Sequence, residues 1–458
     1  MIEPLEEADK PQRKDGPWRS AEGMASLPEV FRTIPVPTGG PGWRRLLAFI
    51  GPGYLVAVGY MDPGNWATDI AGGAAFNYQL LSVVLISSLM AVFLQALSAK
   101  LGIVTGRDLA QACRDAYSKP TSIMLWLSAE IAIVACDLAE VIGAAIALNL
   151  LFGLPYVVGV ILTGADVLLV LALQSKGFRW IETFVITLIG TMMVIFSLEL
   201  FFSKPNWHGV VWGFIPAGSV ISNHYELYIA LGILGATVMP HNLYLHSSII
   251  QTRRFGKSAA ELKDAIKMAY TDSSVALTLA FFVNAAILIV AAAVFYNSGH
   301  RGVQDIPEAY KLLAPLVGVS IATPLFAIAL LASGQNSTLT GTLAGQIVLE
   351  GFLQVKIRPW LRRMISRLIA LVPAVFAVWI YGEKGIAQLM IFSQVVLSAQ
   401  LSFAVVPLIQ FTSDRKKMGE FSNGLVTKIL GWGLAVVIAV LNVYLVYTMI
   451  FPKAAPTH

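Results

Sequence analysis

Two strongly apolar segments of the chain are each interrupted near the middle by a proline with polar neighbours. The first interruption is Asp62-Pro63-Gly64-Asn65, and the second is Thr237-Val238-Met239-Pro240-His241. Proline has no N–H to donate and disfavours helical backbone in the residue before it, so each helix must unwind there. Within a membrane, unwound backbone is tolerated only where it is buried in protein or lines a cavity. The two breaks therefore predict a binding site inside the bilayer.

The side chains at the breaks suit a transition-metal cation. Asp62 supplies a carboxylate, which costs at least roughly 2.5 kcal/mol to insert and should therefore meet water or a cation. Asn65 adds an amide oxygen and Met239 a thioether, and the unwound carbonyls of Gly59 and Ala236 are further candidate ligands. Alone, Asn65 would equally serve as a helix cap and Met239 as apolar filler. Together they favour Mn²⁺, Fe²⁺, Co²⁺ or Cd²⁺ over the hard ions Mg²⁺ and Ca²⁺.

The composition is that of a polytopic membrane protein. Of 458 residues, 56% are hydrophobic and only 13% are charged, and the mean hydropathy is +0.70. A helix needs about 20 residues to cross the hydrocarbon core, and eleven segments meet that length. They are 46–70, 80–99, 122–151, 156–173, 181–202, 227–250, 274–296, 321–349, 364–381, 386–411 and 425–450.

The basic residues indicate the orientation in the membrane. With the first 45 residues inside, all but five of the 32 Lys and Arg residues fall in the amino-terminal segment, in alternate loops or at helix ends on that side. This asymmetry predicts a cytosolic amino terminus and, after eleven spans, a carboxyl terminus outside. The net charge of +5 thus reflects membrane orientation rather than nucleic-acid binding. The chain is therefore predicted to be a multi-pass membrane protein with its basic side facing the cytosol.

Two broken helices at corresponding positions predict two inverted five-helix repeats. Residues 46–202 form the first repeat and 227–411 the second, joined by an extracellular loop, 203–226. Residues 1–45 are predicted to be a disordered cytosolic tail, and 412–458 contain the eleventh span and a short outside tail. The alternative is a plain helical bundle with two proline kinks, which are common in membrane helices.

The motifs at the breaks resemble those of the Nramp (natural resistance-associated macrophage protein) family. The resemblance is carried by Gly51-Pro52-Gly53, Tyr60-Met61-Asp62-Pro63-Gly64-Asn65 and Gly235-Ala236-Thr237-Val238-Met239-Pro240-His241, followed by Tyr244-Leu245-His246-Ser247. It implies a LeuT-like fold and proton-coupled uptake of divalent transition metal, chiefly Mn²⁺ and Fe²⁺, across a bacterial cytoplasmic (inner) membrane. Relatives that carry magnesium lack these motifs in this form.

The resemblance also implies a metal-ligand set. The ligands are expected at Asp62, Asn65, Met239 and the carbonyl of Ala236, with Gln394 joining in some states. Gly59 stands where the resemblance predicts alanine. Glycine and alanine both have a backbone carbonyl, so this ligand is retained. The added backbone freedom of glycine is expected to affect transitions between transport states.

A row of carboxylates is the candidate proton route. Glu130, Asp137 and Glu140 are spaced by seven and three residues, which places them on one helix face. Arg367 in the ninth span is a candidate partner, and the pattern alone would equally describe structural ion pairing. The resemblance implies a route from Asp62 past the histidine at the second break to this row.

His241 is expected to have a proton or gating role, and His246 to belong to a polar network. Thr237, Asn284 and Gln95, with Gln335 and Asn336, would line the permeation path or bond neighbouring helices. Asp166 in the fourth span has no assigned role.

Two other functions remain open at this point. An amino-acid symporter of the same architecture would bind a substrate carboxylate, which Asp62 would repel. A membrane metalloenzyme would need a motif such as His-Glu-x-x-His, which the sequence lacks. The sequence therefore predicts a transporter and not an enzyme. It predicts no resident cofactor, transient binding of Mn²⁺ or Fe²⁺ with H⁺ as coupling ion, and no partner beyond the metal and the lipid bilayer.

Overall fold

A computed structural model describes most of the chain. The described residues are 26, 34–37, 42–163, 178–303, 305–355, 357–358, 361, 364–365, 368–369, 372 and 383–450.

Helices account for nearly all of the regular structure. In chain order the elements are β1 (Ile34–Pro35), α1 (Gly42–Phe49), α2 (Pro52–Gly59), α3 (Pro63–Phe76), α4 (Leu81–Thr105), α5 (Leu109–Ala116), α6 (Lys119–Phe152), α7 (Tyr156–Thr163), α9 (Phe178–Ser203), α10 (Trp207–Gly213), α11 (Ser219–Ser222), α12 (His224–Val238), α13 (Pro240–Ile249), η2 (Ile250–Thr252), β2 (Arg253–Arg254), α14 (Ala259–Ala291), η3 (Ala292–Tyr296), α15 (Ile306–Val317), α16 (Ala322–Leu353), α18 (Glu383–Ser413), α19 (Arg415–Met418), η4 (Gly419–Phe421) and α20 (Leu425–Ile450).

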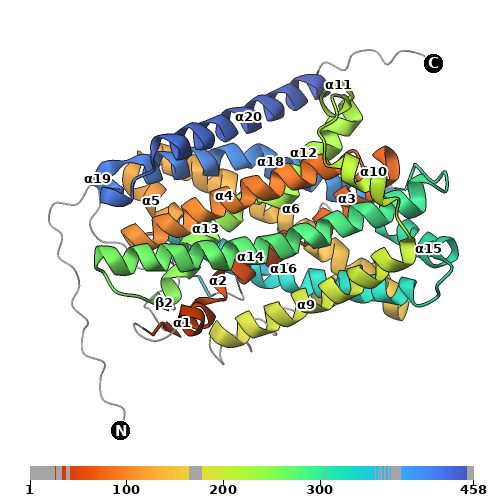
Figure 1. The fold of residues 1–458 in the computed structure, drawn as a ribbon, viewed down its shortest axis with the longest axis horizontal. Helices are drawn as coiled ribbons and strands as arrows, with labels where there is room; N and C mark the ends of the chain where they lie inside the picture. The colour runs from red at the N-terminus through yellow and green to blue at the C-terminus, as the bar shows by residue number, and fades with distance from the viewer. Residues whose placement is uncertain are drawn as a thin grey trace, which may run out of the picture.

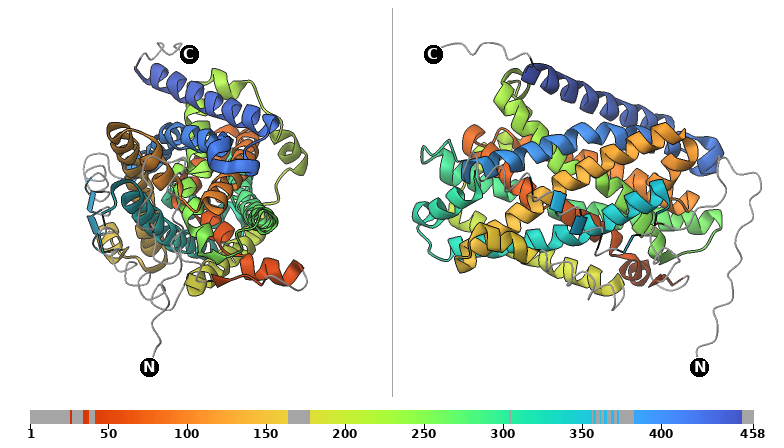
Figure 2. Two further views of the ribbon diagram at one scale, coloured as in Figure 1. Left: turned by 90° about the vertical axis from the view of Figure 1, so that its left-hand side faces the viewer. Right: turned by 180° about the vertical axis from the view of Figure 1, so that it is seen from behind.

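The long helices run roughly along the longest axis of the molecule, and the two broken helices lie among them (Figures 1 and 2). Helices α2 and α3 form one broken pair and α12 and α13 the other. Around them pack α4, α6, α14, α16 and α18, while α20 lies along one edge of the bundle. This arrangement places the breaks in the interior of the bundle.

Six of the described helices are long and apolar enough to cross a membrane. They are Leu81–Thr105, Lys119–Phe152, Phe178–Ser203, Ala259–Tyr296, Ala387–Ser413 and Leu425–Tyr447. Helix α16 is also long, at 32 residues, but its run of Ser, Thr, Asn and Gln residues lowers its hydropathy. The prediction of an all-helical membrane protein is confirmed, whereas the number of eleven spans stays a prediction.

Parts of two predicted spans lie outside the described residues. Helix α7 covers only the beginning of the fourth span, and Asp166 falls beyond it. Most of the ninth span, including Arg367, likewise lies outside the described residues, as do Arg362 and Arg363 just before it.

The two ends of the bundle differ in charge. Elements α1, β2, α5 and α19 gather at one end, and α10, α11 and α15 at the other (Figure 1). Of the first group, α1, β2 and α19 each carry two or three Arg or Lys residues. The described end of α20 lies at the end opposite α1 (Figure 1). This sorting follows the pattern expected for a membrane orientation signal.

Part of the segment predicted to be a disordered tail has regular structure. Strand β1 pairs in parallel with β2, with Ile34 opposite Arg253, and Val36 N donates to the carbonyl of Arg254 at 3.3 Å. Ser26 Oγ donates to Asp108 Oδ2 at 2.5 Å. Before Gly42, the described residues are 26 and 34–37.

Candidate functional site

The two helix breaks face each other directly. The side-chain amide of Asn65, in the first turn of α3, donates to the carbonyl of Ala236, near the end of α12, at 3.1 Å. In a regular helix the carbonyls of Gly59 and Ala236 would each bond the N–H four residues later. Those positions are Pro63 and Pro240, which have no N–H. The prolines therefore free the two carbonyls that the sequence predicted as ligands.

Asp62 has one carboxylate oxygen occupied and one open. Asp62 is the N-cap of α3, and its Oδ1 accepts from the backbone N of Asn65 at 2.9 Å and from Asn65 Nδ2 at 2.7 Å. The side chain is wholly buried, and Oδ2 has no hydrogen-bond partner among the described residues. A buried carboxylate oxygen without a donor is costly, so this atom is suited to receive a cation.

Asn284 on α14 fixes the geometry of the first break. Its Nδ2 donates to the carbonyl of Tyr60 at 2.7 Å and to Asn65 Oδ1 at 3.3 Å. Ser333 on α16 donates to the carbonyl of Met61 at 2.5 Å. These contacts satisfy the carbonyls that unwinding exposes, and they hold Asn65 with its amide oxygen turned toward α14.

Met239 joins α12 to α13 in a backbone conformation that few residues adopt. Its φ is 29° and its ψ is 101°, and it is the C-cap of one helix and the N-cap of the next. Such conformations persist only where the surrounding structure enforces them. The side chain is buried against Ala132 and Cys136 of α6 and Leu397 of α18. Asn242 Nδ2 lies 3.5 Å from its sulfur and donates to it.

Gly59 has no Cβ and so leaves space for the Asn242 side-chain amide beside Met239. A Cβ at position 59 would overlap Asn242 Nδ2 and would lie 3.3 Å from the Met239 sulfur. The glycine that stands in place of the expected alanine thus provides space as well as backbone freedom.

We expect Gly59→Ala to raise the apparent KM for Mn²⁺ roughly threefold to tenfold, because overpacking a tight site costs about 1 kcal/mol or more. Adding Asn242→Ala should recover part of that loss, since it removes the group that clashes. The measurement is Mn²⁺ uptake into proteoliposomes by the two single variants and the double variant. Strictly additive effects would contradict this account of the contact.

Gln394 of α18 lies against both breaks. A Cβ at Gly64 would overlap its side-chain amide, and a Cβ at Gly235 would overlap its carbonyl oxygen. Its Nε2 donates to Ser393 Oγ at 3.0 Å, and its Oε1 has no partner among the described residues. The predicted accessory ligand is therefore adjacent to the motif that supplies Asp62 and Asn65.

The carboxylates of α6 begin next to the first break. Gly143 of α6 packs against the ring of Pro63, and Glu140 lies three residues before it. Asp137 and Glu140 are buried, and Glu130 is partly exposed. Glu140 accepts from Thr338 Oγ1 at 3.5 Å. The row thus leads from the break along α6 toward the end that holds α5, and its proposed partner Arg367 lies outside the described residues.

The two histidines of α13 differ in their contacts. His241 directly follows Pro240 and is buried, and its Nδ1 has no partner among the described residues. His246 Nδ1 lies 3.0 Å from Gln95 Oε1. Gln95 Nε2 then donates to Tyr60 Oη at 2.6 Å, and Tyr60 Oη donates to the carbonyl of Val238 at 3.3 Å. His246 and Gln95 thus form a polar chain that ends at the second break.

Several residues at the site were not singled out from the sequence. Tyr60 and Ser333 bond the unwound carbonyls, and Asn242 bonds the Met239 sulfur. Asp69 of α3 is buried, and neither of its carboxylate oxygens has a hydrogen-bond partner in the described part of the chain. Asp69 is seven residues after Asp62, which is the spacing of one helix face and a signal that the sequence already contained.

Comparisons with known proteins agree on one family. The model of the family described as "Natural resistance-associated macrophage protein-like" matches residues 53–448. A divalent metal cation transporter MntH of Listeria monocytogenes serotype 4a (strain HCC23) is 57% identical over 439 residues, covering 96% of this chain and 98% of the relative. The MntH of Bradyrhizobium diazoefficiens is 56% identical over 429 residues, covering 93% and 95%.

Solved structures of transporters share the fold. The manganese transporter of Eremococcus coleocola superposes with a TM-score of 0.86 at 40% identity, covering 94% of this chain and 93% of that one. Mhp1, a nucleobase-cation-symport-1 family transporter, superposes with a TM-score of 0.60 at 15% identity, covering 89% and 94%, and so shares the fold alone. The predicted LeuT-like fold is thereby confirmed.

Proposed function

Because this chain belongs to the Nramp family of divalent metal cation transporters, we propose that it takes up Mn²⁺ and Fe²⁺, and also Co²⁺ and Cd²⁺, in symport with protons. The transport would proceed by alternating access across a bacterial cytoplasmic membrane, with the amino terminus in the cytosol. Like its relatives, the protein is a membrane transporter; it is not an enzyme.

One observation supports the proposed site above all others. The open oxygen of Asp62, the Asn65 side chain, the Met239 sulfur and the freed carbonyl of Ala236 all lie at two helix breaks that hydrogen-bond to each other. Carboxylate, amide and carbonyl oxygens suit all divalent ions, but a thioether favours softer transition metals. The proposed selectivity against Mg²⁺ and Ca²⁺ comes from the sulfur, and the negative charge comes from Asp62.

The proposed orientation gives uptake an electrical driving force. A membrane potential that is negative inside contributes about 2.3 kcal/mol per charge per 100 mV, or about 4.6 kcal/mol for a divalent cation. The half-helices α2 and α13 would move relative to α3 and α12, because the breaks leave each pair joined by only a few residues. The metal would stay at the breaks while the path on either side opens in turn.

Proton coupling is proposed to use the carboxylates of α6 together with His241 and Asp62. We expect Asp137→Asn to flatten the pH dependence of Mn²⁺ uptake between pH 5.5 and 7.5, because the variant has no proton to exchange at that position. The measurement is the initial rate of uptake at both pH values, with Asp414→Asn, in the loop before α19, as the matched control. A pH dependence in Asp137→Asn equal to that of the native protein would contradict a coupling role.

An amino-acid symporter remains the alternative with the same architecture. It is disfavoured because a substrate carboxylate would meet Asp62, which no Lys or Arg contacts within the described residues. Competition assays distinguish the two functions: amino acids should leave Mn²⁺ uptake unchanged, whereas Cd²⁺ should inhibit it.

A further inference from the structure

Two buried carboxylates lie between the helix breaks and the end of the bundle that holds α10, α11 and α15, a part of the molecule here called the outer half. They are Asp69 of α3, which is 1% exposed, and Glu199 of α9, which is 0% exposed. In the described part of the chain, neither oxygen of either carboxylate has a hydrogen-bond partner. The proton coupling proposed above does not use these two residues.

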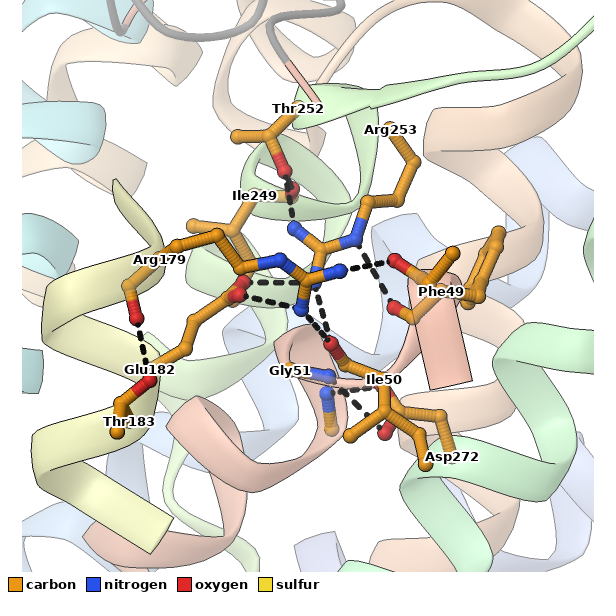
Figure 3. Close-up of polar contacts among 12 residues, drawn as sticks. Phe49, Ile50, Gly51, Arg179, Glu182, Thr183, Ile249, Thr252, Arg253 and Asp272 are labelled. Atoms are coloured by element: carbon orange, nitrogen blue, oxygen red, sulfur yellow. Dashed lines mark hydrogen bonds and ion pairs between the residues drawn. The ribbon is translucent and has the colours of Figure 1, made fainter. Parts of the chain in front are cut away.

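Buried carboxylates at the opposite end of the bundle are bound, as the surroundings of the start of α2 show (Figure 3). Asp272 of α14 accepts from a backbone N–H of α2 at 2.7 Å, and Glu182 of α9 lies 2.7 Å from the guanidinium group of Arg253. Such contacts stabilise the ionised form of a buried carboxylate. The two carboxylates of the outer half have no such contact among the described residues, so a bound proton is the simplest way to offset their burial.

The two carboxylates lie at a similar depth in the bundle. Trp66 of α3 contacts Phe196 of α9, with ring centroids 4.9 Å apart, and each carboxylate follows its helix's ring by three residues. Both helices run toward the α10 end (Figure 1), where Asn206 N, just after α9, donates to Tyr78 Oη, just after α3, at 3.3 Å. Both acids are therefore about one helical turn outside the same aromatic contact.

Two further polar atoms lie beside these rings. Trp66 also contacts Phe326 of α16, with ring centroids 5.1 Å apart. Residues of α16 that precede Ser333, which bonds the first break, lie progressively further outward, so Thr323 is one turn outside Phe326. Within the described residues, Thr323 Oγ1 and Trp66 Nε1 have no hydrogen-bond partner. Buried polar atoms of this kind usually bind ordered water, which would connect the two carboxylates.

Asp69 is linked electrostatically to the metal site. It follows Asp62 by seven residues, or about 10 Å along α3. The charge of Asp62 acts on Asp69, and the charge of Glu140 acts on Asp62. The three carboxylates thus form a series from the outer half, through the first break, to the row on α6. A divalent cation at Asp62 would cancel the repulsion between Asp62 and Asp69, and so would favour release of a proton from Asp69.

Other ionisable groups of the outer half are bound or exposed. The elements packed against α3 are α6, α12, α14, α15, α16, α18 and η3. Among residues whose side chains are described, the acidic and basic ones that these elements bring to the outer half are His224, Glu226, Glu308 and Lys311. Glu226 is buried and accepts from Ser219 Oγ at 3.3 Å, and the other three are exposed.

We propose that Asp69 and Glu199 are the outer proton acceptors of the transporter, which take up protons from the side on which α10 lies and pass them to Asp62. In each transfer one proton leaves a carboxylic acid and binds a carboxylate, so no other reactant is needed. The inference rests on the proton symport proposed above and adds its entry half, because the row on α6 leads only from the break toward the α5 end.

The test measures proton entry and Mn²⁺ uptake in the same proteoliposomes, with a pH-sensitive dye inside and a membrane potential that is negative inside. Asp69→Asn and Glu199→Gln should each lower the number of protons that enter per Mn²⁺ at least about fivefold, because an amide accepts no proton in this range. Glu226→Gln is the matched control, since Glu226 is also a buried carboxylate of the outer half but has a hydrogen-bond donor. The control should leave the ratio unchanged.

Mn²⁺ binding to the purified variants separates a proton role from metal binding and from misfolding. The Kd of both variants should stay within about threefold of the native value, because the proposed ligands are intact. Loss of Mn²⁺ binding would overturn the proposal, as would a ratio of protons to Mn²⁺ within about twofold of the native ratio in both variants.

A variant that binds Mn²⁺ but shows no net uptake is examined by exchange of radioactive Mn²⁺ at equal pH on both sides. Exchange should persist, because it needs no net proton movement, and its loss would also overturn the proposal. Native protein that takes up Mn²⁺ without proton entry would contradict the proposed symport, and the inference with it. Proton entry with the native protein and an unchanged ratio in the variants would contradict the inference alone.

Discussion

Replacing Asp62 with asparagine is expected to lower Mn²⁺ uptake at least about 100-fold. Asparagine has the same size and is an equally good N-cap, so α3 should still begin at Pro63 with its first N–H groups bound. What is lost is the charge on the open oxygen that the cation would take. A 100-fold loss corresponds to about 2.8 kcal/mol, a modest figure for removing the only charged ligand from a buried site.

Initial rates of Mn²⁺ uptake into proteoliposomes, together with Mn²⁺ binding to the purified variant, measure this effect. Asp108→Asn is the matched control, because Asp108 is also a buried N-cap aspartate but lies at α5, away from both breaks. The control should keep nearly native uptake. Uptake by Asp62→Asn within threefold of the native rate would mean that the metal does not bind at the breaks.

Replacing Met239 with alanine is expected to change selectivity more than activity. Without the thioether the site offers only oxygen ligands, which hard ions accept as well as transition metals do. We expect Mg²⁺ or Ca²⁺ to compete with Mn²⁺ at least about tenfold more effectively in the variant, and Cd²⁺ affinity to fall by a similar factor. Uptake of Mn²⁺ itself should fall less than in Asp62→Asn.

Competition by Mg²⁺ and Ca²⁺ against Mn²⁺ uptake, in native protein and variant side by side, is the required measurement. Met90→Ala serves as the control, because Met90 on α4 is similarly buried and its loss tests the effect of a cavity alone. An unchanged preference for Mn²⁺ over Mg²⁺ and Ca²⁺ in Met239→Ala would mean that the sulfur does not determine selectivity.

The centre of the site could be predicted from the sequence because the features that form it depend on residues close together in the chain. A proline frees the carbonyl four residues before it, and Asp62 caps the half-helix that Pro63 begins. The helical, membrane-embedded fold could also be predicted, because an apolar segment of about 20 residues has few alternatives to a helix in a bilayer. The repeat boundaries and the roles of the α6 carboxylates stay predictions.

Contacts between distant segments could not be predicted in this way. The Glu182–Arg253 pair joins residues that lie far apart in the chain, and nothing in either sequence neighbourhood specifies the partner. The Asn242 contact with Met239 depends on the space left by Gly59 in another helix. In the same way, Ser333 of α16 donates to the carbonyl of Met61 between α2 and α3, and the sequence around Ser333 does not specify that partner.

X-ray absorption at the cadmium edge, on purified protein loaded with Cd²⁺, tests the central claim most directly. A site formed by both breaks predicts a first shell of oxygen ligands with one sulfur, and the sulfur should disappear in Met239→Ala while the oxygens remain. A native spectrum fitted by oxygen and nitrogen alone, or one left unchanged by Met239→Ala, would contradict a metal site built from Asp62, Asn65 and Met239.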